Sequence, residues 1–214
     1  MCLLFMVRGI NPLSRKLRRV SLHLLHRLLL FFSLLVILGC LSAQISIPKE
    51  GSIVCFGDSL TEGSGAGIGE DYPTVLSNLL NEKIVNAGRS GDTTEDALMR
   101  LDSDVLSRNP RLTIVLLGGN DFLTGKRIED TYRNIEEIVK KIKESGSAVL
   151  LISPIGRYDK GYQRIATKYN CLFIPHILRS ILGNPKYKYD SVHPNSKGYR
   201  VMAEMIYKKI EPYL

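Results

Sequence analysis

Short apolar runs alternate with longer amphipathic stretches from residue 48 onward. Apolar runs of three to six residues bounded by turn residues are typical of buried strands, and we expect them at Ile53–Phe56, Ile84–Asn86, Leu112–Leu117, Ala148–Ile152 and Leu172–Ile174. The stretches between and after them predict helices over Tyr72–Asn81, Thr94–Ser107, Ile128–Ser145, Gly161–Tyr169 and Ser196–Tyr213. Strands that alternate with helices predict an α/β fold with a parallel sheet covered on both faces.

The period is clearest in the stretch from residue 128 to residue 145. Its apolar side chains fall on one helical stripe, formed by Ile128, Tyr132, Ile135, Ile138, Val139 and Ile142. Charged side chains such as Glu136 and Lys140 fall on the opposite side. Ser145 and Gly146 then supply an ordinary helix stop. A helix with one apolar stripe packs against a sheet, which agrees with the α/β prediction.

The first 45 residues have a different character from the rest. Basic residues between Arg8 and Arg27 precede the uncharged apolar segment Leu28–Leu41, which is the order found in secretory signals. As a helix, this segment would be about 21 Å long, against about 30 Å for the hydrocarbon core of a bilayer. We therefore predict a signal peptide over residues 1–45, with an uncleaved membrane anchor as the alternative. In both cases the domain over residues 46–214 is exported, and we expect it at the periplasmic face of a bacterial membrane or secreted.

Ile37-Leu38-Gly39-Cys40 resembles the bacterial lipobox, in which the cysteine is acylated and becomes the new N-terminus. Leu38 departs from the smaller residue preferred at that place. The other cleavage site, after Ala43, has bulky Leu41 where a small residue is wanted. We therefore favour lipidation at Cys40, and the membrane as a partner through this segment.

Charge excludes one class of partner. The chain has 214 residues and a formal charge of +8. Six of its 29 basic residues precede Ser46 and no acidic residue does, so the rest carries 23 bases against 21 acids. A nucleic-acid-binding domain concentrates its basic residues on the folded part. We therefore expect no nucleic-acid partner. About 170 residues suffice for one ordinary domain, which we expect to be a monomer.

The first candidate chemistry follows the first predicted strand. Gly57-Asp58-Ser59 comes directly after Phe56, and parallel α/β sheets place their sites at the carboxyl ends of the strands. A serine on a sharp turn from strand to helix exposes its hydroxyl and its own N–H to the same point, as an acyl-transfer nucleophile requires. The alternative is an ordinary turn in which Asp58 or Ser59 caps a helix.

A serine nucleophile needs a base, and the histidines offer two choices. His23 and His26 lie in the leader, so the base would be His176 or His193. Asp190 precedes His193 by three residues, close enough for its carboxylate to accept from Nδ1–H and leave Nε2 free to take the serine proton. His176 has no acidic neighbour, and we interpret it as a histidine without a catalytic part.

Two glycine-containing turns can supply electrophilic help. Asn120 follows the glycine pair after Leu117, and Gly91 lies in the turn after Asn86. We expect the Asn120 amide and the Gly91 N–H, where no side chain blocks a close approach, to join the Ser59 N–H as donors to an oxyanion. Taken singly, each of these motifs is an ordinary tight turn.

Together the segments GDSLTEGSGAG, NAGRSGDTT, LLGGND and DSVHPN resemble, in this order, the four blocks of the SGNH (GDSL-type) hydrolase family. The flanking residues are similar to its bacterial branch of thioesterases, arylesterases and lysophospholipases. The resemblance implies a flavodoxin-like three-layer α/β/α sandwich with a five-stranded parallel sheet. It also implies Ser59 as nucleophile, His193 as base, Asp190 as orienting acid, and Ser59, Gly91 and Asn120 as the oxyanion hole.

The implied activity is hydrolysis of carboxylic esters, or thioesters, of small or lipid-like acyl groups through an acyl-enzyme, with no metal and no cofactor. An O-acetyl esterase of carbohydrate or cell wall is the alternative among enzymes, and a non-catalytic binding lipoprotein is the alternative from another class. Lys186 and Lys188, just before Asp190, would attract anionic substrates if they lie at the site mouth. Cys55 and Cys171 do not imply a disulfide, and neither has metal-ligand spacing.

Overall fold

The structure is a computed structural model that describes residue 27 and residues 45–214. The predictions for the leader and for Cys40 lie outside the described residues. Residues Ile45–Leu214 form one contact unit. Within the described part of the chain, no helix combines the length and the apolar character needed to cross a membrane.

Five parallel strands form a single sheet in the order β2-β1-β3-β4-β5. Their bounds are β1 Ser52–Gly57, β2 Ile84–Gly88, β3 Pro110–Leu116, β4 Ala148–Ile152 and β5 Leu172–Ile174. The chain leaves β1 toward one edge to form β2 and then returns to the other side of β1 to form β3. The carboxyl ends of β1 and β3 therefore flank the point where strand order reverses, which is where ligands bind in open α/β sheets. This confirms the flavodoxin-like order of strands.

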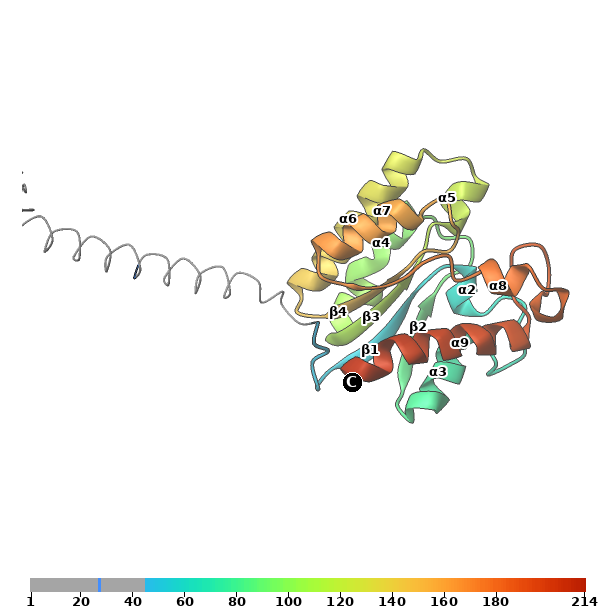
Figure 1. Cartoon of the computed structure of the whole chain (residues 1–214), viewed down its shortest axis with the longest axis horizontal. Coiled ribbons are helices and arrows are strands. Elements are labelled where there is room, and N and C mark those ends of the chain that lie inside the picture. Colours follow the sequence, from blue (N-terminus) through green and yellow to red (C-terminus); the bar gives the residue numbers. More distant parts are fainter. Residues whose placement is uncertain (1–26, 28–44) are drawn as a thin grey trace, which may run out of the picture. The chain divides into compact units, whose positions relative to one another are not determined.

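Helices cover both faces of the sheet, as Figure 1 shows. One face packs against α3 Tyr72–Leu80 and α9 Ser196–Ile210, and the other packs against α4 Thr94–Asp104, α6 Ile128–Glu144 and α7 Asp159–Lys168. Side chains alternate along β1, so that Ile53 and Cys55 join the first layer while Val54 and Phe56 join the second. All four are fully buried, so β1 is an inner strand that is covered on both faces by the two helical layers.

Short helical turns that periodicity did not predict lie mostly between strands and long helices. They are α2 Ser59–Glu62, α5 Gly119–Leu123, α8 Arg179–Leu182 and η2 Pro185–Tyr187. Each is at most five residues long, too short to show a helical period. Three of them carry or adjoin the predicted site residues.

Two predicted helices end earlier than expected. The stretch from residue 94 to residue 107 is divided into α4 and the 3₁₀ turn η1 Leu106–Arg108, because Val105 leaves helical geometry at φ −124°. The last helix ends at Ile210 and continues as η3 Glu211–Tyr213. Pro212 accounts for the second change, since proline has no N–H to donate and its ring collides with the preceding turn.

Cys55 and Cys171 are free and buried, on opposite faces of the sheet. The sheet therefore separates the two thiols, and they form no disulfide. Burial raises the pKa of the Cys171 thiol to about 11 and that of Cys55 further still, so both behave as small apolar side chains.

Candidate active site

Ser59 begins α2 directly after β1 ends. The Asp58 carboxylate caps this short helix by accepting the Leu60 N–H at 3.0 Å. A Cβ at Gly57 would overlap the Thr61 hydroxyl and approach the Leu116 carbonyl. Glycine is therefore what lets the chain turn this sharply between strand and helix. The result places Ser59 at the carboxyl end of β1.

Ser59, His193 and Asp190 form one chain of hydrogen bonds. Ser59 Oγ lies 3.0 Å from His193 Nε2, and His193 Nδ1 lies 2.8 Å from Asp190 Oδ2. Asp190 Oδ1 accepts the N–H groups of Val192 and His193 at 2.8 and 2.7 Å. The hydrogen bond from His193, together with these two N–H groups, lowers the pKa of Asp190 to about 2. An ionised acceptor at Nδ1 fixes the tautomer in which Nε2 accepts the serine proton.

The loop that carries His193 is braced by its own backbone. Tyr189 N–H donates to the His193 carbonyl at 2.9 Å, and Asn195 N–H donates to the Tyr187 carbonyl at 2.9 Å. The Asn195 side chain donates to the carbonyls of Lys186 and Lys188, and its oxygen caps α9 at the Gly198 N–H. Asn195 is therefore the N-cap of α9. Asn195 thereby joins the base-carrying loop to a long helix.

Gly91 and Asn120 come from the ends of β2 and β3. Gly91 has φ +86°, a backbone conformation that residues other than glycine rarely adopt, and nothing lies within 4 Å of the place where a Cβ would be. This backbone angle by itself favours glycine at position 91. Asn120 Nδ2 donates to the Asp92 carbonyl at 2.8 Å. An amide NH₂ has two protons, so a second N–H remains for a ligand.

A pocket of about 360 Å³ opens onto these groups. Its polar lining includes Ser59, Gly91, Asn120 and His193, and Asp190 supports His193 from behind. Asp58, Ser90, Gly119 and Ser191 also line it. The rest of its wall is apolar and consists of Leu60, Phe122, Leu123, Pro154, Ile155, Leu178, Leu182 and Val192. The structure therefore brings all five predicted residues to one place, beside an apolar cavity.

Two other predicted features lie outside this pocket. His176 is not among the residues that line it, and its N–H donates to the Asp159 carboxylate at 3.1 Å. Lys186 and Lys188 do not line it either. Lys186 Nζ lies 5.6 Å from the centre of the Tyr187 ring, in the turn that leads to Asp190. The structure thus agrees with the choice of His193 over His176.

Two buried carboxylates lie beside the site, Asp58, for which the sequence predicted only a capping role, and Asp121, for which it predicted none. Desolvation raises the pKa of Asp58, which is only 2% exposed, to about 7. Asp121 is fully buried and accepts Thr94 N–H at 2.8 Å, Thr94 Oγ1–H at 2.6 Å and Thr131 Oγ1–H at 3.2 Å. These bonds tie α5, which carries Asn120, to α4 and α6. The sequence did place an acidic residue directly beside Ser59 and beside Asn120, but an ordinary role in a turn also explains an acidic residue at such a place.

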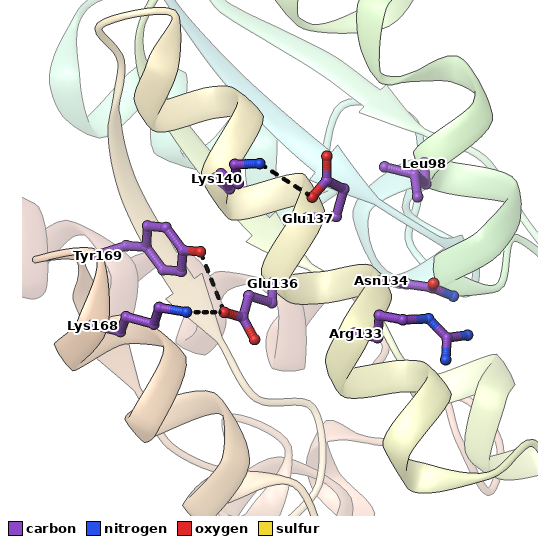
Figure 2. Close-up of a pocket in the computed structure, with 8 residues that line it drawn as sticks. All are labelled: Leu98, Arg133, Asn134, Glu136, Glu137, Lys140, Lys168 and Tyr169. Carbon is purple, nitrogen blue, oxygen red and sulfur yellow. Dashed lines mark hydrogen bonds and ion pairs between the residues drawn. The ribbon is translucent and has the colours of Figure 1, made fainter.

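A second, larger groove of about 600 Å³ lies between α4, α6 and the end of α7 (Figure 2). Four of its charged side chains pair with one another, Glu136 with Lys168 at 2.5 Å and Glu137 with Lys140 at 3.9 Å. None of the predicted site residues lines it. Among the residues that the structure describes, no cluster of three or more His, Cys, Asp or Glu side chains could hold a metal ion.

Comparisons with known proteins agree with this geometry. The model of the GDSL-like Lipase/Acylhydrolase family matches residues 55–201. Thioesterase 1/protease 1/lysophospholipase L1 of Escherichia coli is 27% identical over 174 residues, covering 75% of this chain and 84% of that protein. The uncharacterized lipoprotein YqeF of Bacillus subtilis is 37% identical over 131 residues, covering 56% of this chain and 51% of that protein.

A solved structure has the same fold. The psychrotrophic esterase EstA from Pseudoalteromonas sp., in a structure inhibited by monoethylphosphonate, superposes with a TM-score of 0.67 at 26% identity. The alignment covers 77% of this chain and 98% of that one. The match of the family model over most of the chain, with the fold and the grouped residues, shows that the chain belongs to the GDSL-like lipase/acylhydrolase family and is a hydrolase.

Proposed function

We propose that this protein is a serine esterase that cleaves carboxylic esters of apolar acyl groups. Ser59 is the nucleophile, His193 the general base and Asp190 the acid that orients the base. One observation carries the proposal. Ser59 Oγ, His193 Nε2 and Asp190 are joined by hydrogen bonds of 3.0 and 2.8 Å at the edge of a largely apolar pocket. This is the arrangement that general-base activation of a hydroxyl requires.

In the first half of the reaction, His193 Nε2 takes the proton of the Ser59 hydroxyl as Oγ attacks the carbonyl carbon of the ester. The carbon becomes tetrahedral and its oxygen becomes an oxyanion. His193 then returns the proton to the leaving alcohol as the ester C–O bond breaks, and an acyl-Ser59 remains. Asp190, ionised because its pKa is about 2, stabilises the imidazolium that exists between the two proton transfers.

In the second half, water takes the place of the alcohol. His193 removes a proton from the water, the hydroxide attacks the acyl-Ser59 carbonyl, and a second tetrahedral oxyanion forms. Its collapse breaks the bond to Oγ, which recovers the proton from His193. The products are the free acid and the regenerated Ser59.

The oxyanion of both steps is stabilised by three donors, the N–H groups of Ser59 and Gly91 and the Asn120 side-chain amide. All three residues line the same pocket. Such donors act on charge that exists only in the transition state, and losing one costs about 10²–10³ in kcat. We therefore expect Asn120→Ala to lower kcat by this factor and to leave KM nearly unchanged.

The pocket wall indicates the acyl group. Eight of its side chains are apolar and come from α2, α5, α8 and the turns after β4 and before α9. A cavity of about 360 Å³ has the size of ordinary ligand pockets. It has room for more than an acetyl group, which favours small to medium or lipid-like acyl esters, with thioesters as a related substrate, over carbohydrate O-acetyl groups.

A panel of substrates tests this proposal. Initial rates are measured on p-nitrophenyl esters from C2 to C12, on acyl-CoA, on lysophosphatidylcholine and on acetylated xylan. Rates that rise with chain length support the proposal, and activity confined to acetyl esters would contradict the acyl assignment. If Ser59→Ala kept more than a few per cent of the wild-type activity, the assignment of Ser59 as the nucleophile would be wrong. A fluorophosphonate probe that labels the wild type but not Ser59→Ala excludes the non-catalytic binding protein.

We also propose that residues 1–45 direct export and that Cys40 is the site of lipidation. The support is the order of basic and apolar residues before Cys40 and the presence of a lipoprotein among the relatives. Incorporation of a radiolabelled or alkyne fatty acid by bacteria expressing the full chain tests this. Label that persists in Cys40→Ser would contradict the assignment, and loss of label with the protein still exported would support it.

A further inference from the structure

Arg100 is a buried cation on the apolar stripe of α4, beside Ala97 and Leu101. Its side chain is only 6% exposed, and its guanidinium lies 4.6 Å from the centre of the Phe56 ring. A buried charge is retained only where its donors are satisfied. An arginine at this place therefore calls for partners on the sheet side of the helix.

At the carboxyl edge of the sheet, the guanidinium has three hydrogen-bond acceptors: one side-chain carboxylate and two main-chain carbonyls. Nε donates to Asp92 Oδ2 at 2.5 Å, Nη1 to the Ala87 carbonyl at 3.0 Å and Nη2 to the Gly57 carbonyl at 2.8 Å. Ala87 lies near the end of β2, and Gly57 ends β1, two residues before Ser59. One side chain thus joins the ends of two strands to the turn that follows β2.

Asp92 continues this connection to the proposed oxyanion donors. Its side chain, 7% exposed, holds Arg100, while its carbonyl accepts Asn120 Nδ2 at 2.8 Å. Its neighbour in the chain is Gly91, which has φ +86°. Two of the three proposed donors are therefore attached to Asp92, Gly91 through the peptide bond and Asn120 through a hydrogen bond.

We infer that Arg100 and Asp92 are positioning residues, which fix the Gly91 N–H and the Asn120 amide relative to Ser59. The inference rests on the proposed oxyanion hole. Neither residue lines the pocket, so neither contacts the substrate in this proposal. Their effect is geometric, because the rigid guanidinium fork sets the distance between the Ser59 turn and the Asp92 turn. A displacement of about 1 Å in such donors is enough to cost about 10²-fold in rate.

Asp104 provides a matched control. It also receives a hydrogen bond from Arg100, from Nη1 to Oδ2 at 2.9 Å, but it sits one helical turn further along α4 and is 25% exposed. Its other side-chain partners are Ser103 and the exposed Arg89, at 2.9 and 3.5 Å, so it has no direct hydrogen bond to Gly91 or Asn120. A merely structural role for Arg100 would be disturbed by loss of either carboxylate, whereas a positioning role depends on Asp92 alone.

The experiment compares Asp92→Asn, Arg100→Lys and Asp104→Asn by kcat, KM and melting temperature on p-nitrophenyl octanoate. We expect Asp92→Asn and Arg100→Lys to lose about 10- to 100-fold in kcat with KM changed less than threefold. Lysine keeps the charge but cannot reach three partners at once. Asp104→Asn should keep kcat within twofold.

A second readout does not depend on stability. A trifluoromethyl ketone with an octyl chain forms a tetrahedral adduct with the serine, so its Ki reports on the oxyanion donors. We expect its Ki to rise in Asp92→Asn by the same factor as kcat falls. If Asp92 acts through Asn120, its effect should be small once the Asn120 amide is absent. We therefore expect Asp92→Asn to lower kcat much less in the Asn120→Ala background than in the wild type.

Three outcomes overturn the inference. They are an unchanged kcat in folded Asp92→Asn, equal losses of kcat in Asp92→Asn and Asp104→Asn, and full additivity of Asp92→Asn with Asn120→Ala. Should Arg100→Lys fail to fold, Asp92→Asn and its double variant still decide the matter. Ser59→Ala is measured in parallel. Retained activity in Ser59→Ala refutes the proposed function, whereas an inactive Ser59→Ala with a fully active Asp92→Asn refutes only the positioning role.

Discussion

Replacing Asp190 by asparagine tests the proposed mechanism most directly, because the structure dictates how the new amide must lie. Asp190 Oδ1 accepts two backbone N–H groups, those of Val192 and His193. In Asp190→Asn only the amide oxygen can take that place, so the NH₂ must face His193 Nδ1. A donor at this position requires Nδ1 to accept, and the proton of the neutral ring then moves to Nε2. The imidazole can no longer accept the Ser59 proton.

The size of the effect follows from the exposure of the carboxylate. The corresponding change in a buried serine-protease triad lowers kcat about 10⁴-fold. The Asp190 side chain is 43% exposed, so water can partly replace it and the ring can partly reorient. We therefore expect a loss of about 10²–10³ in kcat, or about 3–4 kcal/mol in the activation barrier.

The assay is kcat and KM on p-nitrophenyl butyrate between pH 5 and pH 9, with Asp190→Ala as the control. Alanine leaves space for water and imposes no tautomer, so Asp190→Ala should lose less activity than Asp190→Asn. The pKa of Asp190 is about 2, so the carboxylate stays ionised across this range and causes no fall in wild-type activity. Asp190→Asn that keeps more than a tenth of wild-type kcat, with its fold intact, would refute the tautomer argument.

Three further predictions concern Asp58, Gly91 and the two buried cysteines. The pKa of Asp58 is raised to about 7, so the folded state holds a proton that the unfolded state releases, and this contribution to stability is lost as pH rises from about 4 to about 7. The melting temperature of Asp58→Asn, relative to that of the wild type, should therefore be higher at pH 8 than at pH 4. A difference in melting temperature that stays constant with pH would contradict the burial argument. Gly91→Ala should destabilise by about 1–2 kcal/mol in urea titrations, from its φ of +86° alone, and also lower kcat, while an unchanged stability would show that the turn relaxes. Cys55 and Cys171 are buried with raised pKa values, so neither should react with a thiol reagent until the domain unfolds, and rapid labelling of the native protein would be the opposite result.

The sheet could be predicted because its signal is local. Each strand is a short apolar run, and the order of runs and helical stretches alone specifies parallel connections. The exact ends of the helices were harder to predict from the sequence. Val105 and Pro212 end regular helix for reasons of backbone angle and of a missing N–H, whereas the apolar period continues past both.

The site was predictable to the extent that its residues follow strands. Ser59, Gly91 and Asn120 come after β1, β2 and β3, which lie side by side, so their meeting follows from topology. The wall of the pocket was not predictable, since Leu182 and Ile155 reach it from unrelated turns. Arg100 gave only the weak signal of a base on an apolar stripe, and its partners are revealed by tertiary structure alone.

The hydrogen bond between Ser59 and His193 joins residues 134 positions apart in the chain. The acid and the base are three residues apart, so this pair can form locally, but it reaches the serine only when α9 has packed beside α3. On the proposed mechanism, a chain still emerging from the ribosome is therefore catalytically silent. Hydrolysis begins only once the segment after residue 190 has docked, so esterase activity reports that the domain has finished folding.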